Sequence, residues 1–178
     1  VLRAASPTEK VFRDRPFEHG AFPCRLMAAR HEWESFQVVV APARPLKQLR
    51  VAAAAPVLIT NPTVRIPAGN VVINPVGYVE VSNAFYYPSS HVGWWPDPLF
   101  DNKPLDVAHR VQPYWVTVYV PPGQPAGTYE GRILLQAEGG IRRSVSYRLE
   151  VRDFTLPLRG ELTTFIDFRY QPSDREIR

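Results

Sequence analysis

The stretch Gln112-Pro-Tyr-Trp-Val-Thr-Val-Tyr-Val-Pro-Pro-Gly-Gln-Pro-Ala-Gly-Thr-Tyr-Glu-Gly-Arg-Ile133 decides the fold. From Tyr114 to Val120 the valines alternate with Trp115, Thr117 and Tyr119, and this period of two predicts a strand. The prolines and glycines of residues 121–127 then predict a turn, and a second alternating run follows it. We expect the two strands to pair as the centre of an antiparallel sheet.

Similar patterns occur on both sides of this stretch. Strands are expected at Arg25–Ala29, Glu34–Ala41, Leu49–Ala55, Val71–Ile73, Gly77–Val81, Arg132–Ala137 and Ile141–Arg152. Lys10–Phe12 could form a short edge strand, Val57–Pro67 is expected to be a loop, Asn74-Pro75 a turn and Gly139-Gly140 a hairpin turn. About eight strands without a convincing helix predict an all-β fold, an antiparallel β-sandwich of immunoglobulin or jelly-roll type.

Composition excludes several classes of protein. The 19 prolines among 178 residues argue against a helical fold, because a proline inside a helix costs about 3 kcal/mol. No apolar run approaches the roughly 20 residues that span a bilayer, and the first residues do not resemble a signal peptide. The formal charge is +4, but the basic residues are dispersed, so neither nucleic acid nor a membrane is expected as a partner.

The aromatic residues between positions 83 and 112 are the candidate ligand contacts. This segment lacks a strand or helix period, and long irregular segments are often functional. Exposed indole rings can stack on sugars, so the candidate carbohydrate contacts are Trp94, Trp95, Tyr86, Tyr87 and Asp97. The alternative, which we favour, is that these rings fold back against the sandwich or a neighbouring domain.

No catalytic residue, metal site or cofactor is predicted. Glu32 and Glu34 are close in sequence, but such a pair is more often a solvated strand end than a catalytic site. The acidic residues at 97, 101 and 106 lack calcium-loop spacing, and the four histidines lack metal-ligand spacing. Cys24 is the single cysteine and has no nucleophile motif around it.

Four segments together resemble a known family. They are Ala29-Arg-His-Glu-Trp-Glu-Ser-Phe-Gln-Val-Val-Val40, Trp95-Pro-Asp-Pro-Leu99, residues 112–131 of the opening stretch, and Val151-Arg-Asp-Phe-Thr-Leu-Pro157. In this order they look like the N-terminal β-sandwich domain that precedes the catalytic barrel in bacterial proteins of glycoside hydrolase family 123 and their uncharacterised relatives. The resemblance covers roughly residues 20 to 168 and is carried by the ordered set.

The resemblance implies a division of the chain and a role for it. Residues 1–157 would be an accessory sandwich, and 158–178 a linker and the start of a (β/α)8 barrel with Leu162–Phe168 as its first strand. Characterised members are β-N-acetylgalactosaminidases that use an Asp-Glu pair in the barrel. This sequence contains no Asp-Glu dipeptide, so no catalytic residue is carried over. The barrel is the implied partner, and an extracellular or periplasmic location is expected.

Three hypotheses of function follow. The chain is a non-catalytic accessory domain of a glycoside hydrolase-like protein, a self-standing carbohydrate-binding module, or a structural subunit that assembles with further copies of itself. The second makes a glycan the partner and requires exposed tryptophan rings. The third makes a homo-oligomer, with sheet edges that pair between copies.

Overall fold

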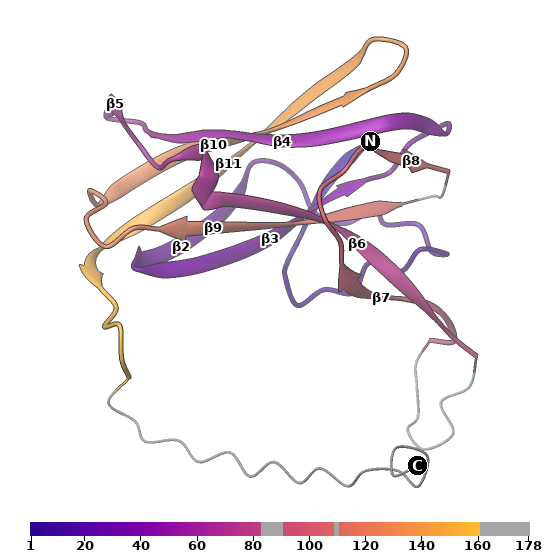
Figure 1. Cartoon of the computed structure of the whole chain (residues 1–178), viewed down its shortest axis with the longest axis horizontal. Coiled ribbons are helices and arrows are strands. Elements are labelled where there is room, and N and C mark those ends of the chain that lie inside the picture. Colours follow the sequence, from indigo (N-terminus) through magenta and orange to yellow (C-terminus); the bar gives the residue numbers. More distant parts are fainter. Residues whose placement is uncertain (83–90, 109–110, 161–178) are drawn as a thin grey trace, which may run out of the picture.

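The computed structural model describes residues 1–82, 91–108 and 111–160, which form two packed β-sheets (Figure 1). The first sheet contains, in order, β1 (Leu2–Ala5), β3 (Glu32–Val40), β9 (Gln112–Val120), β6 (Val71–Val81) and β7 (Gly93–Leu99). The second contains β2 (Cys24–Arg30), β11 (Ile141–Thr155), β10 (Gly127–Ala137), β4 (Leu46–Leu58) and β5 (Asn61–Arg65), with β8 (Leu105–Val107) paired to β4. The predicted all-β sandwich is confirmed.

Two further features complete the architecture. Strand β2 runs parallel to β11, whereas the other strand pairs of the described residues are antiparallel. In the described part of the chain the one helical segment is a 3₁₀ turn at Ala68–Asn70. No helix there is long and apolar enough to cross a membrane.

The core lies between the sheets and is built from the inward rows of the strands. The inward row of β9 is fully buried, as its alternation predicts. It packs in one cluster with Phe36 of β3 and with the buried aromatic and aliphatic side chains of β10 and β11, among them Tyr129, Ile133, Tyr147 and Leu149. Each large apolar side chain buried in this way contributes roughly 1.5–3 kcal/mol to folding.

The predicted pairing of the two strands in the opening stretch is wrong. β9 pairs with β3 and β6, whereas β10 pairs with β11 and β4 in the opposite sheet. The proline-rich turn therefore carries the chain from one sheet to the other. An alternating pattern shows only that one face of a strand is buried. In a sandwich the strands of both sheets bury one face in the same core, so the pattern does not show which sheet a strand belongs to. The predicted hairpin between β10 and β11 is confirmed.

Several predicted boundaries are also corrected. The expected loop at Val57–Pro67 contains the end of β4 and the short edge strand β5, where a proline is tolerated. Asn74-Pro75 does not interrupt β6, because Pro75 lies where pairing with β9 ends and pairing with β7 begins. Residues 83–112 include β7 and β8, and Lys10–Phe12 is not a strand. The prediction of Leu162–Phe168 as a strand lies outside the described residues.

The two sheets are joined at one corner by hydrogen bonds around Arg30 and His31. His31 alone links β2 to β3 and has a positive φ of 62°. Its backbone N–H donates to Val120 O at 2.7 Å, and the Arg30 side chain donates through Nε to Gln124 O at 2.7 Å. The backbone N–H of Leu156 donates to Arg30 O at 3.0 Å. Two of the crossings between the sheets, from β2 to β3 and from β9 to β10, therefore meet the end of β11 at this corner.

Two buried tyrosines should respond in opposite ways to loss of the hydroxyl group. The Tyr129 hydroxyl donates to Pro125 O at 2.7 Å and accepts from Gln124 Nε2 at 2.8 Å. The Tyr147 hydroxyl is buried and has no hydrogen-bond partner among the described residues. We expect Tyr129→Phe to lower the free energy of unfolding by about 1–3 kcal/mol, and Tyr147→Phe to leave it unchanged or raise it. Urea denaturation measures both, and equal losses would contradict the assignment.

The absence of a side chain at Gly131 of β10 leaves room for the ring of Tyr147. A Cβ at this position would lie 2.1 Å from Cζ of Tyr147, whereas a Cβ at Gly123 would meet nothing within 4 Å. We expect Gly131→Ala to lower the free energy of unfolding by about 1–3 kcal/mol through overpacking. The control Gly123→Ala should change it by less than about 0.5 kcal/mol in the same denaturation experiment. A neutral Gly131→Ala would show that the ring can move aside freely.

Candidate functional site

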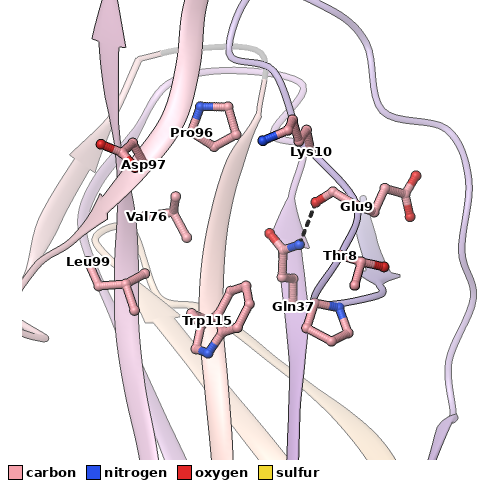
Figure 2. Close-up of a pocket in the computed structure, with 10 residues that line it drawn as sticks. Thr8, Glu9, Lys10, Gln37, Val76, Pro96, Asp97, Leu99 and Trp115 are labelled. Carbon is pink, nitrogen blue, oxygen red and sulfur yellow. Dashed lines mark hydrogen bonds between the residues drawn. The ribbon is translucent and has the colours of Figure 1, made fainter. Parts of the chain in front are cut away.

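A groove of about 480 Å³ lies on the outer face of the first sheet (Figure 2). Val76 of β6 and Trp115 of β9 are at its centre, with Gln37 of β3 beside them. Pro96, Asp97 and Leu99 of β7 form one wall, and the segment 7–10 that follows β1 forms the other. Trp115 points outward because the alternation of β9 directs the neighbouring valines into the core. We call this site the Trp115 groove.

Gln37 attaches the segment after β1 to the sheet. Only 3% of this residue is exposed, and its amide nitrogen donates to Ser6 O and to Glu9 O, each at 2.8 Å. A second, smaller apolar cluster covers the same face of the sheet and consists of Ala5, Val11, Val39 and Val111. The wall formed by residues 7–10 is therefore held in place from both sides.

Asp97 is the predicted contact residue that lines this groove. Its side chain is exposed, and Figure 2 shows its carboxylate directed away from Trp115. Tyr86 and Tyr87 lie outside the described residues. The structure describes three of the predicted contact residues, Trp94, Trp95 and Asp97. Of these, Asp97 alone lines the groove, and it lies at the rim.

Trp94 and Trp95 of β7 contact the N-terminal segment instead. The guanidinium group of Arg13 lies 4.5 Å from the ring centre of Trp94. The edge of Phe12 meets Trp95 with ring centres 5.1 Å apart, and Lys10 Nζ lies 5.0 Å from the same ring. These contacts agree with the interpretation that the rings pack against protein. Their role as a sugar-binding platform stays a prediction.

A second aromatic feature on the same outer face was not predicted as a site. Trp33 of β3 is 59% exposed and stacks on Tyr119 of β9 with ring centres 4.4 Å apart and an interplanar angle of 29°. His31 meets Tyr119 edge-on at 6.0 Å, and its Nδ1–H donates to Leu156 O at 3.2 Å, since a carbonyl oxygen only accepts. We call His31, Trp33 and Tyr119 the exit cluster, because they adjoin the end of β11.

A sequence signal for both features existed. The outward row of β9 contains Trp115, Thr117 and Tyr119, and alternation alone places these residues on the face opposite the core. What alternation does not give is the cross-strand register that puts Trp33 opposite Tyr119 and Gln37 opposite Trp115. The candidate site therefore required the pairing of β3 with β9.

Two of the acidic residues considered in the sequence, Glu32 and Asp106, have structural partners. Glu32 accepts a hydrogen bond from the backbone N–H of Ala29 and closes the link between β2 and β3. The backbone N–H of Gln48 and the Lys47 ammonium hold the pKa of Asp106 below its usual range. Within residues 1–82, 91–108 and 111–160, no group of three or more His, Cys, Asp or Glu is placed to hold a metal ion.

Comparison with known proteins gives the family. The family model for the glycoside hydrolase 123 N-terminal domain matches residues 21–137. The chain belongs to this family. The match covers β2 to β10 and includes the exit cluster and the strands of the Trp115 groove, but not the wall formed by residues 7–10. No curated protein matches the chain by sequence.

A solved structure supports the fold of this family 123 domain. A family 123 glycoside hydrolase from Clostridium perfringens, described in a study of glycolipid glycan hydrolysis, matches with a TM-score of 0.70 and 15% identity. The match covers 89% of this chain and 28% of that one, so the chain spans just over a quarter of that enzyme's length. The seventh PapD-like domain of human CEP192 matches with 11% identity over 88% of this chain and 87% of that one, but its TM-score of 0.31 carries no argument.

The thiol of Cys24 should be unreactive at neutral pH. Burial raises its pKa from 9.0 to about 11, so the nucleophilic thiolate is scarce. We expect iodoacetamide to modify the folded chain about a hundredfold more slowly at pH 8 than the chain unfolded in guanidinium chloride. The folded rate should rise with pH until about pH 11. Equal rates for folded and unfolded chains at pH 8 would contradict this assignment.

Proposed function

We propose that this chain is a non-catalytic accessory domain that supports the C-terminal catalytic barrel of a glycoside hydrolase-like protein. The observation that carries the proposal is the position of the exit cluster, an exposed aromatic surface beside the point where β11 ends. Membership of the glycoside hydrolase 123 N-terminal domain family supports the same role.

The exit cluster has the properties that an interdomain contact needs. Trp33 and Tyr119 offer a stacked aromatic surface, and aromatic residues are enriched in the cores of interfaces between proteins. Phe154 and Leu158 are also largely exposed on the last residues of the described chain. The two hydrogen bonds of Leu156 to the Arg30–His31 corner fix the direction in which the chain leaves the sandwich. A domain that follows residue 160 would therefore start next to this surface.

The activity of the whole protein is part of the same proposal. The matched Clostridium perfringens enzyme belongs to family 123, and its structure was analysed to explain the hydrolysis of glycolipid glycans. We place the proposed activity, a β-N-acetylgalactosaminidase outside the cell or in the periplasm, in the barrel. The sandwich would contribute to folding and positioning of that barrel rather than to the reaction.

The test uses the protein that carries this chain together with the residues encoded after Arg178. We expect Trp33→Ser to lower its melting temperature by several degrees, because the aromatic contact between the exit cluster and the following domain would be lost. Residues 157–160, which adjoin this contact, should then become accessible to protease. The isolated chain should lose only about 0.5–1.5 kcal/mol, since the Trp33–Tyr119 stack is mostly solvated.

The matched control is Met27→Ser, a change at another exposed apolar side chain, on the opposite sheet. It should leave both proteins unchanged. Equal effects of Trp33→Ser on the isolated chain and on the longer protein would refute the interface. A stop codon directly after Arg178, or a stable oligomer of the isolated chain in light scattering, would favour an assembly subunit instead.

A further inference from the structure

Trp115 differs from the other three tryptophans of the chain in what touches its ring. Trp33 stacks on Tyr119, and the rings of Trp94 and Trp95 are covered by side chains of the N-terminal segment. Trp115 is half-buried, and among the described residues neither an aromatic ring nor a cation lies on its indole. Its N–H also makes no hydrogen bond within the described part of the chain. The groove therefore presents an open indole with an unused donor.

Gln37 adds a fixed hydrogen-bond acceptor next to this indole. Its amide nitrogen is identified by its two partners, because the carbonyl oxygens of Ser6 and Glu9 can only accept. The amide oxygen must then face the other way, and Figure 2 shows it on the side of the groove. It makes no hydrogen bond to any described residue, although the side chain is almost fully buried. This acceptor is not among the fully buried atoms without a partner, so it is open to the groove and available to a ligand.

The charge and size of the groove narrow the ligand class. Glu9, Lys10 and Asp97 lie at the lining, so the two carboxylates outnumber the one cation and disfavour an anionic ligand. No arginine is present among the described lining residues to bind phosphate. Pro96 and Leu99 add apolar surface to the wall formed by β7. The volume of about 480 Å³ falls within the range of small-molecule sites. These features favour a compact, neutral ligand with one apolar face and several hydroxyl groups.

We infer that the Trp115 groove binds a neutral sugar unit of a glycan, a hexose or an N-acetylhexosamine. The apolar face of the pyranose would lie on the indole of Trp115, and a hydroxyl or amide N–H would donate to Gln37 Oε1. The Lys10 ammonium at the rim is placed to donate to a ring or hydroxyl oxygen. This function is separate from the proposed support of a barrel, because it uses different residues from those of the exit cluster.

The test is a titration of the 178-residue chain with galactose, glucose, N-acetylgalactosamine and N-acetylglucosamine, and with short glycans that contain them. Two-dimensional NMR would follow the indole N–H of Trp115 and the side-chain amide of Gln37. We expect at least one sugar to bind with a dissociation constant on the order of 1 mM and to shift both signals. Trp115→Ala should weaken binding about tenfold or more, and Trp115→Phe by less, because the apolar surface is partly kept.

One variant serves as a control on the same sheet face. Trp33→Ala removes the exposed indole of the exit cluster, which lies outside the lining of the Trp115 groove. It should leave sugar binding within about twofold of the unchanged chain, because this side chain does not contact the ligand. Absence of binding to all the sugars, binding that survives Trp115→Ala in a folded chain, or binding lost in Trp33→Ala would each overturn the inference. None of these outcomes depends on whether a barrel follows the sandwich.

Discussion

The corner at Arg30 and His31 is the constraint on which the rest of the structure depends. The chain crosses between the sheets twice at this corner, once through His31 and once through the proline-rich turn after Val120. Of the two contacts of the Arg30 side chain, the bond to Gln124 O is the more important for stability. The other, at 2.5 Å to Asp153, is an ion pair with a carboxylate that is 84% exposed, and such pairs contribute little. The corner ties the β2–β3 link to the turn after β9 and fixes the place where β11 ends.

The two surface features of the first sheet both follow from β9. Trp115 and Tyr119 belong to its outward row and are four residues apart, which corresponds to about 13 Å along a strand. The N-terminal segment and β7 wall in the half of the face around Trp115, whereas Trp33 and Tyr119 lie at the half next to the exit of the chain. The separation is large enough for a ligand and a neighbouring domain to occupy the face together. The proposed functions therefore do not compete.

Trp94 and Trp95 illustrate the limit of reasoning from composition. A dense group of aromatic residues in an irregular segment was a reasonable candidate for ligand binding. The structure places Trp94 and Trp95 on β7, and cation–π and edge-to-face contacts with the segment 10–13 cover both rings. That segment has no periodic pattern, so nothing local in the sequence predicts that it returns to β7. The more open indole, that of Trp115, belongs to the most regular strand of the chain.

The sequence by itself determined the local properties of this protein. Alternation identified the long strands β2, β3, β4, β6, β9, β10 and β11 but not β1, β5, β7 or β8. The prolines excluded a helical fold, and four ordered segments indicated the family. Only the tertiary structure decided that β9 and β10 belong to different sheets, that Trp33 faces Tyr119, and that Gln37 presents its oxygen beside Trp115. The reason is physical. The alternation of a strand is visible in consecutive residues, whereas the neighbouring strand with which it pairs depends on hydrogen bonds to a segment that is distant in the sequence. The site depends on these distant pairings, and so it became visible only in the folded chain.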